Sequence, residues 1–306
     1  MKNILELERV SKRFGRNVAL DNVSYEVAPG TVFALLGENG AGKTTTIRIL
    51  LGLTDADMGR AAVLGYDSGK DDLIIRKKVG YVPEQPVLYD WMSVAEIGQF
   101  TAAFYPNGFW QEYCRQVEQY ELPPGAKIKS LSKGMRAKVS LALALAHDPE
   151  LLILDEPTSG LDAMVRREFL ESMVDRAAAG KSVFLSSHQL GEVERVADTV
   201  AIMKKSKVVV VEPLEVLKST TNLVTVTLTD AENRAKLTVP FKSVIEERVN
   251  GREVQILGRY LNPAAQNMLQ SDQNITRFEI RTPSLEEIFI AYMGKDCPPL
   301  PAEKDK

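Results

Sequence analysis

Residues 31–44 read Thr-Val-Phe-Ala-Leu-Leu-Gly-Glu-Asn-Gly-Ala-Gly-Lys-Thr, an apolar run that leads into a glycine-rich turn. The run 31–36 does not alternate between apolar and polar residues, which is typical of a strand buried on both faces in a parallel sheet. Residues 37–44 match the pattern G-x-x-x-x-G-K-[ST], whose backbone N–H groups surround phosphates. The stretch therefore predicts a strand, a phosphate-binding turn and a helix.

The residues of this turn have separate expected roles. Lys43 is expected to bring positive charge to the β- and γ-phosphates of a nucleotide, and the Thr44 hydroxyl to bind Mg²⁺. The following helix adds the positive end of its dipole, which favours an anion. The alternative is a glycine-rich turn that binds nothing, and the strand before it and the helix after it weigh against that. The predicted nucleotide-binding residues are Gly37, Glu38, Asn39, Gly40, Ala41, Gly42, Lys43, Thr44 and Thr45.

A second apolar run, Leu151–Leu154, ends in the adjacent carboxylates Asp155 and Glu156. Neighbouring residues at a strand end point in different directions, so the two carboxylates can take different roles. We expect Asp155 to hold Mg²⁺ through water, and Glu156 to orient or deprotonate a water that attacks the γ-phosphate. Carboxylates at strand ends are common in α/β proteins, so this pair alone leaves the function open.

Three further segments carry a family resemblance. The segment Leu131-Ser132-Lys133-Gly134-Met135 resembles the L-S-G-G-Q signature of the ABC ATPases. The segment Ser159-Gly160-Leu161-Asp162 resembles their D-loop, and Ser186-Ser187-His188 resembles their switch histidine. The segments occur in the order and at the spacing of that family, and the resemblance covers about residues 1–215. It implies the ABC type of P-loop NTPase fold, an ATPase activity, and ATP and Mg²⁺ as ligands.

The resemblance also implies roles for single residues. His188 would hold the γ-phosphate and the attacking water in line, so that Lys43, Glu156 and His188 are the expected catalytic residues. Phe14 would stack on the adenine, although by itself it reads as a core residue. The helix N-terminus at Ser132 would bind the nucleotide held by an opposite subunit, which implies two shared sites in a head-to-tail homodimer or heterodimer.

The sequence departs from the family pattern at two places. The signature has Lys133 where the family has glycine and Met135 where it has glutamine, which leaves the reaction rate and the dimer affinity open. In the loop that corresponds to the family's Q-loop, the glutamine position falls on Glu84 and a glutamine follows as Gln85. A carboxylate can bind Mg²⁺, so Glu84 is a candidate metal ligand beside Thr44 and Asp155. Either Glu84 or Gln85 serves at this position.

The pattern of the chain predicts two domains. Apolar strands alternate with helical stretches such as 139–146 and 163–178, which indicates an α/β domain over residues 1–218 with a helical subdomain over about 86–148. Residues 224–228 then alternate as in an antiparallel strand, and Asn250-Gly251 indicates a hairpin. A smaller α/β domain is therefore expected over 219–306, with a disordered tail from Pro298 to Lys306 and a role that the sequence leaves open.

Composition excludes several classes of protein. The 306 residues carry a formal net charge of −3, which does not support a general nucleic-acid binder. Two cysteines form neither a disulfide framework nor a metal cluster. No signal peptide and no run of about 18 apolar residues is apparent, so we expect a soluble chain that reaches a membrane only through a partner.

Two stretches bear on what the ATP is used for. Aromatic residues are frequent in 86–130, where ABC transporters receive the coupling helix of the membrane subunit, and residues 283–289 resemble the end of bacterial drug- and lipid-exporter ATPases. The first hypothesis is thus a cytoplasmic subunit that powers a separate membrane permease, for export, from the inner face of the cell membrane. The alternatives are a soluble ABC ATPase acting on ribosomes, DNA or metal-cluster assembly, and a non-catalytic regulatory nucleotide binder.

Overall fold

The computed structural model describes residues 3–105 and 107–294. The chain divides into two compact units, residues 1–208 and 209–306. The division falls inside strand β10 (Lys207–Pro213), ten residues before the boundary expected from the sequence at 218/219. The tail that we expect to be disordered, Pro298 to Lys306, lies outside the described residues.

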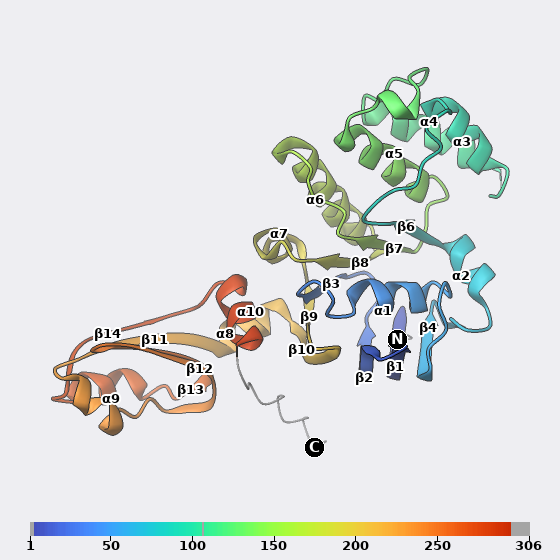
Figure 1. The fold of residues 1–306 in the computed structure, drawn as a ribbon. Helices are drawn as coiled ribbons and strands as arrows, with labels where there is room; N and C mark the ends of the chain where they lie inside the picture. The colour runs from blue at the N-terminus through green and yellow to red at the C-terminus, as the bar shows by residue number, and fades with distance from the viewer. Residues whose placement is uncertain (1–2, 106, 295–306) are drawn as a thin grey trace. The chain divides into compact units, whose positions relative to one another are not determined.

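A parallel sheet forms the centre of the first unit (Figure 1). Its parallel strands run in the order β9 (Thr199–Lys204), β3 (Val32–Gly37), β8 (Ser182–Ser187), β7 (Leu151–Asp155) and β6 (Val79–Val82). Every residue of β3, β7 and β8 is buried, as the unbroken apolar runs predict. Since parallel strands point the same way, the turns after β3, β7 and β8 come to one edge of the sheet.

An antiparallel sheet accompanies it, in the order β2-β1-β4-β5. Its strands are β1 (Leu5–Phe14), β2 (Asn17–Val27), β4 (Met58–Val63) and β5 (Tyr66–Asp67). Helix α1 (Lys43–Leu50) contacts β2 and β4 of this sheet and β3 and β7 of the parallel sheet. It therefore packs between the two sheets and buries its apolar side there.

Three more helices accompany the parallel sheet, namely α2 (Asp72–Lys78), α6 (Ala163–Ala178) and α7 (Leu190–Val196). Helix α6 contacts β3 and β8, α7 contacts β3, and α2 contacts β6. The residue range of α6 is the one that the sequence predicts. The result is an α/β unit with helices on its parallel sheet, the predicted fold class.

Between β6 and β7 the chain forms a helical subdomain (Figure 1). It consists of α3 (Val94–Ala102), α4 (Phe109–Gln119), the 3₁₀ turn η1 (Ile128–Ser130) and α5 (Lys133–Leu145). Its own buried cluster contains Ile97, Phe109, Tyr113, Val117, Ile128 and Val139. Gly98 of α3 lets the ring of Tyr113 approach closely, because a Cβ there would lie 2.1 Å from that ring.

The second unit contains an antiparallel sheet of strands β11 (Thr221–Leu228), β12 (Phe241–Asn250), β13 (Glu253–Leu261) and β14 (Ile275–Arg281), in the order β12-β13-β11-β14. The alternation at residues 224–228 has its apolar members buried in the core of this unit. The expected hairpin is present, but its two loop residues are 251 and 252, because Asn250 pairs with Glu253.

Short helices and a buried arginine complete the second unit. The helices are α8 (Leu214–Thr220), η2 (Ala231–Lys236), α9 (Ala265–Ser271) and α10 (Leu285–Met293). Ser284 and Glu287 form the predicted capping box of α10. Arg259 is fully buried and donates to both carboxylate oxygens of Glu212, at 3.1 and 2.7 Å. None of the helices in the described part of the chain is long and apolar enough to cross a bilayer.

Candidate functional site

The turn after β3 has the backbone shape of a phosphate cradle. Gly40 and Gly42 have φ of +81° and +112°, values that side chains rarely tolerate. A Cβ at Gly42 would lie 2.5 Å from the carbonyl oxygen of Ala19, so only glycine fits. Gly42 also caps α1 without a side-chain hydrogen bond, which leaves the N–H groups of the first helical turn available to an anion.

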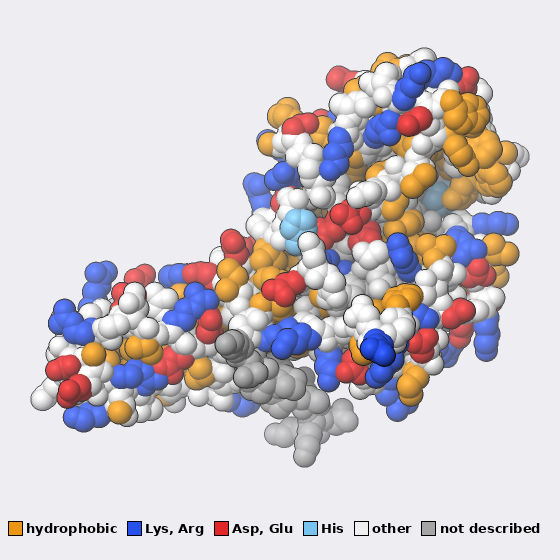
Figure 2. Space-filling view, viewed as in Figure 1, with side chains coloured by type: hydrophobic (Ala, Val, Ile, Leu, Met, Phe, Trp, Pro, Cys, Tyr) orange, Lys and Arg blue, Asp and Glu red, His pale blue; other side chains and the backbone are white. Residues whose placement is uncertain are grey.

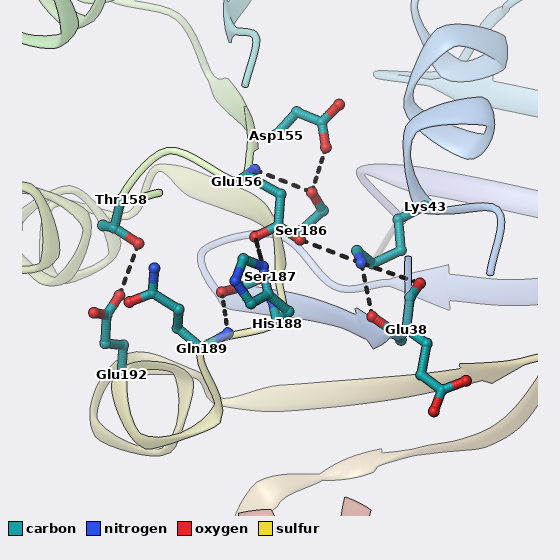
Figure 3. Close-up of polar contacts among 11 residues, drawn as sticks. Glu38, Lys43, Asp155, Glu156, Thr158, Ser186, Ser187, His188, Gln189 and Glu192 are labelled. Carbon is teal, nitrogen blue, oxygen red and sulfur yellow. Dashed lines mark hydrogen bonds and ion pairs between the residues drawn. The ribbon is translucent and has the colours of Figure 1, made fainter. Parts of the chain in front are cut away.

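Lys43 lies inside this turn and is almost fully buried. Its Nζ donates to the carbonyl oxygen of Gly37 at 2.7 Å and lies 3.2 Å from Oε1 of Glu156 (Figure 3). Glu38 and Asn39 are exposed at the outside of the turn, whereas Ala41 is buried. Thr44 and Thr45 are half-buried in the first turn of α1. The loop therefore holds an ammonium group next to the carboxylate predicted as general base.

Asp155, the last residue of β7, is buried and held in a fixed orientation. Its Oδ1 accepts a hydrogen bond from Ser186 Oγ at 2.5 Å, and Ser186 lies on the adjacent strand β8 (Figure 3). Burial, together with the charge of Asp155, raises the pKa of Tyr81 on β6 to about 12. Ser186 lies within the segment that resembles the switch histidine, but the sequence does not predict its contact with Asp155.

Glu156 follows β7 and contacts residues that follow two other strands of the parallel sheet, β3 and β8. It has φ of +48°, a conformation that costs energy for a residue with a side chain and that often marks a functional site. Its N–H donates to the carbonyl oxygen of Ser186 at 3.0 Å. Its Oε2 lies 2.7 Å from Nδ1 of His188 and accepts from the His188 N–H at 3.2 Å. Lys43, Glu156 and His188, the three predicted catalytic residues, are thus in direct contact.

A second network, which the sequence did not lead us to expect, stabilises the loop after Glu156. Glu192 on α7 accepts from the Thr158 hydroxyl at 2.7 Å and pairs with Arg166 at 3.0 Å. Arg166 also donates to the carbonyl oxygen of Leu161 at 3.0 Å. These residues lie up to 34 positions apart, and no local motif signals their pairing. The network connects the D-loop to the helix that follows His188.

The signature segment starts helix α5, as predicted. The Ser132 hydroxyl caps the helix by accepting from the Met135 N–H at 3.2 Å. The predicted D-loop residue Asp162 caps α6 in the same way, at 3.0 and 3.1 Å. Gly134 allows the two helix starts to approach, since a Cβ there would lie 3.2 Å from Val165. Leu131 is buried in the core of the helical subdomain.

Lys133, the departure from the family pattern, lies over the D-loop of its own chain. Its Nζ would be 2.4 Å from a Cβ at Gly160, whose φ is +67°. Lys133 is exposed and forms no ion pair among residues 3–105 and 107–294. In that same part of the chain, no hydrogen bond or ion pair joins the segment 131–135 to the loop 37–45.

The remaining predicted residues, Phe14, Glu84 and Gln85, are all exposed. Phe14, at the end of β1, is 50% exposed, and the Lys12 ammonium lies 5.4 Å from its ring centroid. Glu84 and Gln85 are both exposed in the loop after β6. Neither has a hydrogen bond or ion pair with the other predicted site residues that the structure describes. The roles of these three residues stay predictions.

The chain matches known proteins along most of its length. Residues 20–159 match the family model described as "ABC transporter". The uncharacterized ABC transporter ATP-binding protein YhaQ of Bacillus subtilis is 32% identical over 302 residues, covering 95% of this chain and 99% of that protein. The chain belongs to the ABC transporter ATP-binding proteins. It is thus an ATP-binding subunit of an ABC transporter and an ATPase by family.

Two further comparisons extend the family assignment. The Nod factor export ATP-binding protein I of Cupriavidus metallidurans is 31% identical over 304 residues, covering 97% of this chain and 99% of that protein. A solved structure of the ATP-binding cassette MJ0796, described as dimeric, post-hydrolysis and bound to ADP and Pi, has a TM-score of 0.63 at 23% identity, with 69% of this chain and 98% of that chain covered. This likeness shows that the two proteins share the ABC ATPase fold.

The donor atoms of this ABC ATPase fit Mg²⁺. The candidate ligands Thr44 and Asp155 offer hard oxygen atoms, which this ion prefers. The described residues contain no cluster of three or more His, Cys, Asp or Glu that could hold a metal by itself. Mg²⁺ keeps several waters and usually binds through one or two protein oxygens together with substrate phosphates.

Proposed function

We propose that this chain hydrolyses ATP to power a separate membrane permease, in the direction of export, from the cytoplasmic face of the membrane. The contact of Glu156 with both Lys43 and His188 supports hydrolysis rather than nucleotide binding alone. The Nod factor export protein, which the chain matches over nearly its whole length, supports export. The negative net charge gives no support to the alternative of a soluble ABC ATPase acting on DNA or ribosomes.

The residues of the site have different roles in hydrolysis. Lys43 and the N–H groups at the start of α1 bind the phosphates, and Thr44 and Asp155 would hold Mg²⁺. That ion neutralises charge on the phosphates when it is bound. Glu156 accepts a proton from the attacking water, and His188, held against Glu156, keeps the water in line with the γ-phosphate. Ser186 fixes the orientation of Asp155.

The proposal includes a dimer in which the Ser132 helix of one subunit meets the nucleotide of the other. Ser132 and Lys133 are exposed, and within the described residues they make no hydrogen bond or ion pair with the phosphate loop of the same chain. A helix N-terminus with a capping serine suits an anionic group. The MJ0796 cassette, which shares this fold, is described as a dimer.

A cluster of exposed aromatic side chains is the proposed docking surface for the permease. It consists of Tyr89, Trp91, Phe100 and Phe104, whose neighbouring ring centroids lie 5.4 to 6.0 Å apart. Trp91 and Phe104 are 65% and 63% exposed. Figure 2 shows hydrophobic side chains gathered on the surface around α3. A contiguous exposed patch of this kind marks an interaction site in a soluble domain.

Reconstitution with the permease tests this function. The chain should co-purify with a polytopic membrane protein, and its ATPase rate should rise several-fold when that protein is added in liposomes. Trp91→Ala/Phe104→Ala should lose the stimulation and keep the basal rate. Leu73→Ala, which removes another exposed apolar side chain on α2, is the matched control and should keep both. Co-fractionation with ribosomes or with a soluble complex instead would contradict the proposal and favour the alternative class.

A further inference from the structure

A cavity in the helical subdomain lies away from the ATP site. It has a volume of about 440 Å³, and its lining residues come from α3, α4 and the segment that follows α4. Trp110, Val117 and Leu122 provide its apolar lining, and Cys114 lines it as well. This volume lies in the range of pockets that bind small organic molecules, about 300–1,000 Å³.

The charges at this cavity are all of one sign. Glu118 and Glu121 line it, and no lysine, arginine or histidine of the described residues does. Neither carboxylate forms an ion pair within residues 3–105 and 107–294. Both are exposed to solvent at the edge of the apolar wall.

Two cations of the same subdomain have ion-pair partners of their own. Arg115 on α4 pairs with Glu112 at 2.6 Å, and Lys127 pairs with Glu96 at 2.9 Å. Neither of them neutralises Glu118 or Glu121, the two carboxylates at the cavity.

The backbone places the two carboxylates where a helix disfavours them. Helix α4 ends at Gln119, and the N–H groups of Glu121 and Leu122 donate to the carbonyl oxygens of Glu118 and Val117. Glu121 has φ of +53° in this helix ending, at a position where glycine is the usual residue. The partial negative charge of a helix C-terminus repels carboxylates and attracts cations. A bound cation would relieve this unfavourable arrangement.

We propose that this cavity binds an amphiphilic organic cation. The apolar body of the ligand would lie against Trp110, Val117 and Leu122, and its positive charge would lie next to Glu118 and Glu121. Both the face of the Trp110 ring and the exposed carboxylates attract a cation. The contacts to the apolar wall hold the body of the ligand, and the carboxylates select the sign of its charge.

Tetraphenylphosphonium is the probe, and tetraphenylborate, of the same shape and opposite charge, is its control. Quenching of Trp110 fluorescence is measured in the full chain with the Trp91→Phe substitution, so that Trp110 is the remaining tryptophan. The phosphonium should bind at least about tenfold more tightly than the borate, which corresponds to about 1.4 kcal/mol. Equal binding of the two ions would identify an unselective apolar surface and overturn the proposal.

Glu118→Gln/Glu121→Gln should weaken phosphonium binding about tenfold. Glu150→Gln/Glu171→Gln, which removes the same net charge elsewhere in the unit, is the matched control and should bind as before. Equal affinity of the Glu118/Glu121 variant and the unmodified chain would overturn the assignment of the carboxylates.

Protection of Cys114 gives a second measurement that locates the ligand. In a Cys297→Ser background, Cys114 is the remaining cysteine, and it is exposed. Saturating phosphonium should slow its reaction with a maleimide several-fold. An unchanged labelling rate under saturating phosphonium would place the ligand elsewhere and overturn the proposal.

Discussion

Lys43 Nζ lies 3.2 Å from one carboxylate oxygen of Glu156, and the other oxygen of Glu156 lies 2.7 Å from His188 Nδ1. The side chains of Lys43 and Glu156 are 6% and 8% exposed, so water screens this ion pair little. Lys43 is also the residue expected to hold the β- and γ-phosphates. A nucleotide must therefore bind to a Lys43 ammonium group whose charge Glu156 already partly neutralises.

Glu156→Gln is expected to separate ATP binding from hydrolysis. The amide cannot accept the proton of the attacking water, so the steady-state ATPase rate should fall about 10²–10⁴-fold. Loss of the carboxylate charge also frees Lys43 for the phosphates and removes repulsion, so ATP affinity should rise several-fold. Fluorescent ATP titration and size-exclusion chromatography with Mg²⁺–ATP would measure tighter binding and a trapped dimer. An unchanged turnover would show that another residue is the general base.

Lys43→Ala provides the contrast to that variant, because it should weaken nucleotide binding itself. The two variants together distinguish a failure to bind ATP from a failure to hydrolyse it.

Ser186→Ala tests the contact that orients Asp155. The variant leaves a carboxylate that is only 2% exposed without its hydroxyl partner, which should cost about 1–3 kcal/mol of unfolding free energy. A misoriented Asp155 should also raise the Mg²⁺ concentration needed for half-maximal ATPase activity. Thermal unfolding and a Mg²⁺ titration measure the two effects. Ser172→Ala, whose hydroxyl donates to the Phe169 carbonyl oxygen within α6, is the control.

Much of the first unit follows from local sequence. The strands at 31–36 and 151–154 are apolar throughout, and their burial in a parallel sheet agrees with that pattern. Helix α6 has the bounds expected from the sequence, with Gly180 after its end, and the structure adds Asp162 as its cap. Each of these predictions depends on residues within a few positions of one another, so a single amino-acid sequence is enough to make them.

The contacts that complete the site are not local, and the sequence alone does not reveal them. Ser186 meets Asp155 across 31 positions, and Thr158 meets Glu192 across 34. Serine, threonine and glutamate are common surface residues, so nothing in their type marks them. Only the alignment of β7 beside β8 brings Ser186 to Asp155. The two-residue loop after β12 lies one residue later than the sequence predicts for a similar reason, because strand register depends on both strands.

Lys133→Ala tests the departure from the family signature. In the proposed dimer the Lys133 ammonium lies near the phosphates of the partner's nucleotide, and it has no ion pair of its own in the described part of the chain. Its removal should weaken ATP-dependent dimerisation of the Glu156→Gln protein several-fold and reduce the sensitivity of the dimer to salt. Analytical ultracentrifugation at two salt concentrations measures both. A dimer with unchanged affinity and salt sensitivity would place Lys133 outside the interface.

Arg259→Met tests the buried ion pair of the second unit. The Arg259 side chain is fully buried, while that of Glu212 is 20% exposed. Removing the arginine leaves Glu212 and Thr220 without their partner, so the unfolding free energy of this unit should fall by about 3 kcal/mol. Arg252→Met, in the exposed turn between β12 and β13, is the control and should change little. Denaturant unfolding followed by circular dichroism distinguishes the two variants.

Glu287 is expected to make the stability of the second unit depend on acid pH. Hydrogen bonds from Arg281 and from the N–H of Ser284 lower the pKa of Glu287 from 4.5 to about 2. A carboxylate with a lower pKa in the folded state stabilises the fold at a pH above its unfolded pKa. That contribution is lost as the pH falls from about 4.5 towards 2.

Glu287→Gln should therefore destabilise the unit at pH 7 and flatten the loss of stability in this acid range. Glu286→Gln, on the same helix, should keep the slope of the unmodified chain. Thermal melts between pH 7 and pH 2 measure the difference, and equal slopes for all three proteins would contradict this assignment.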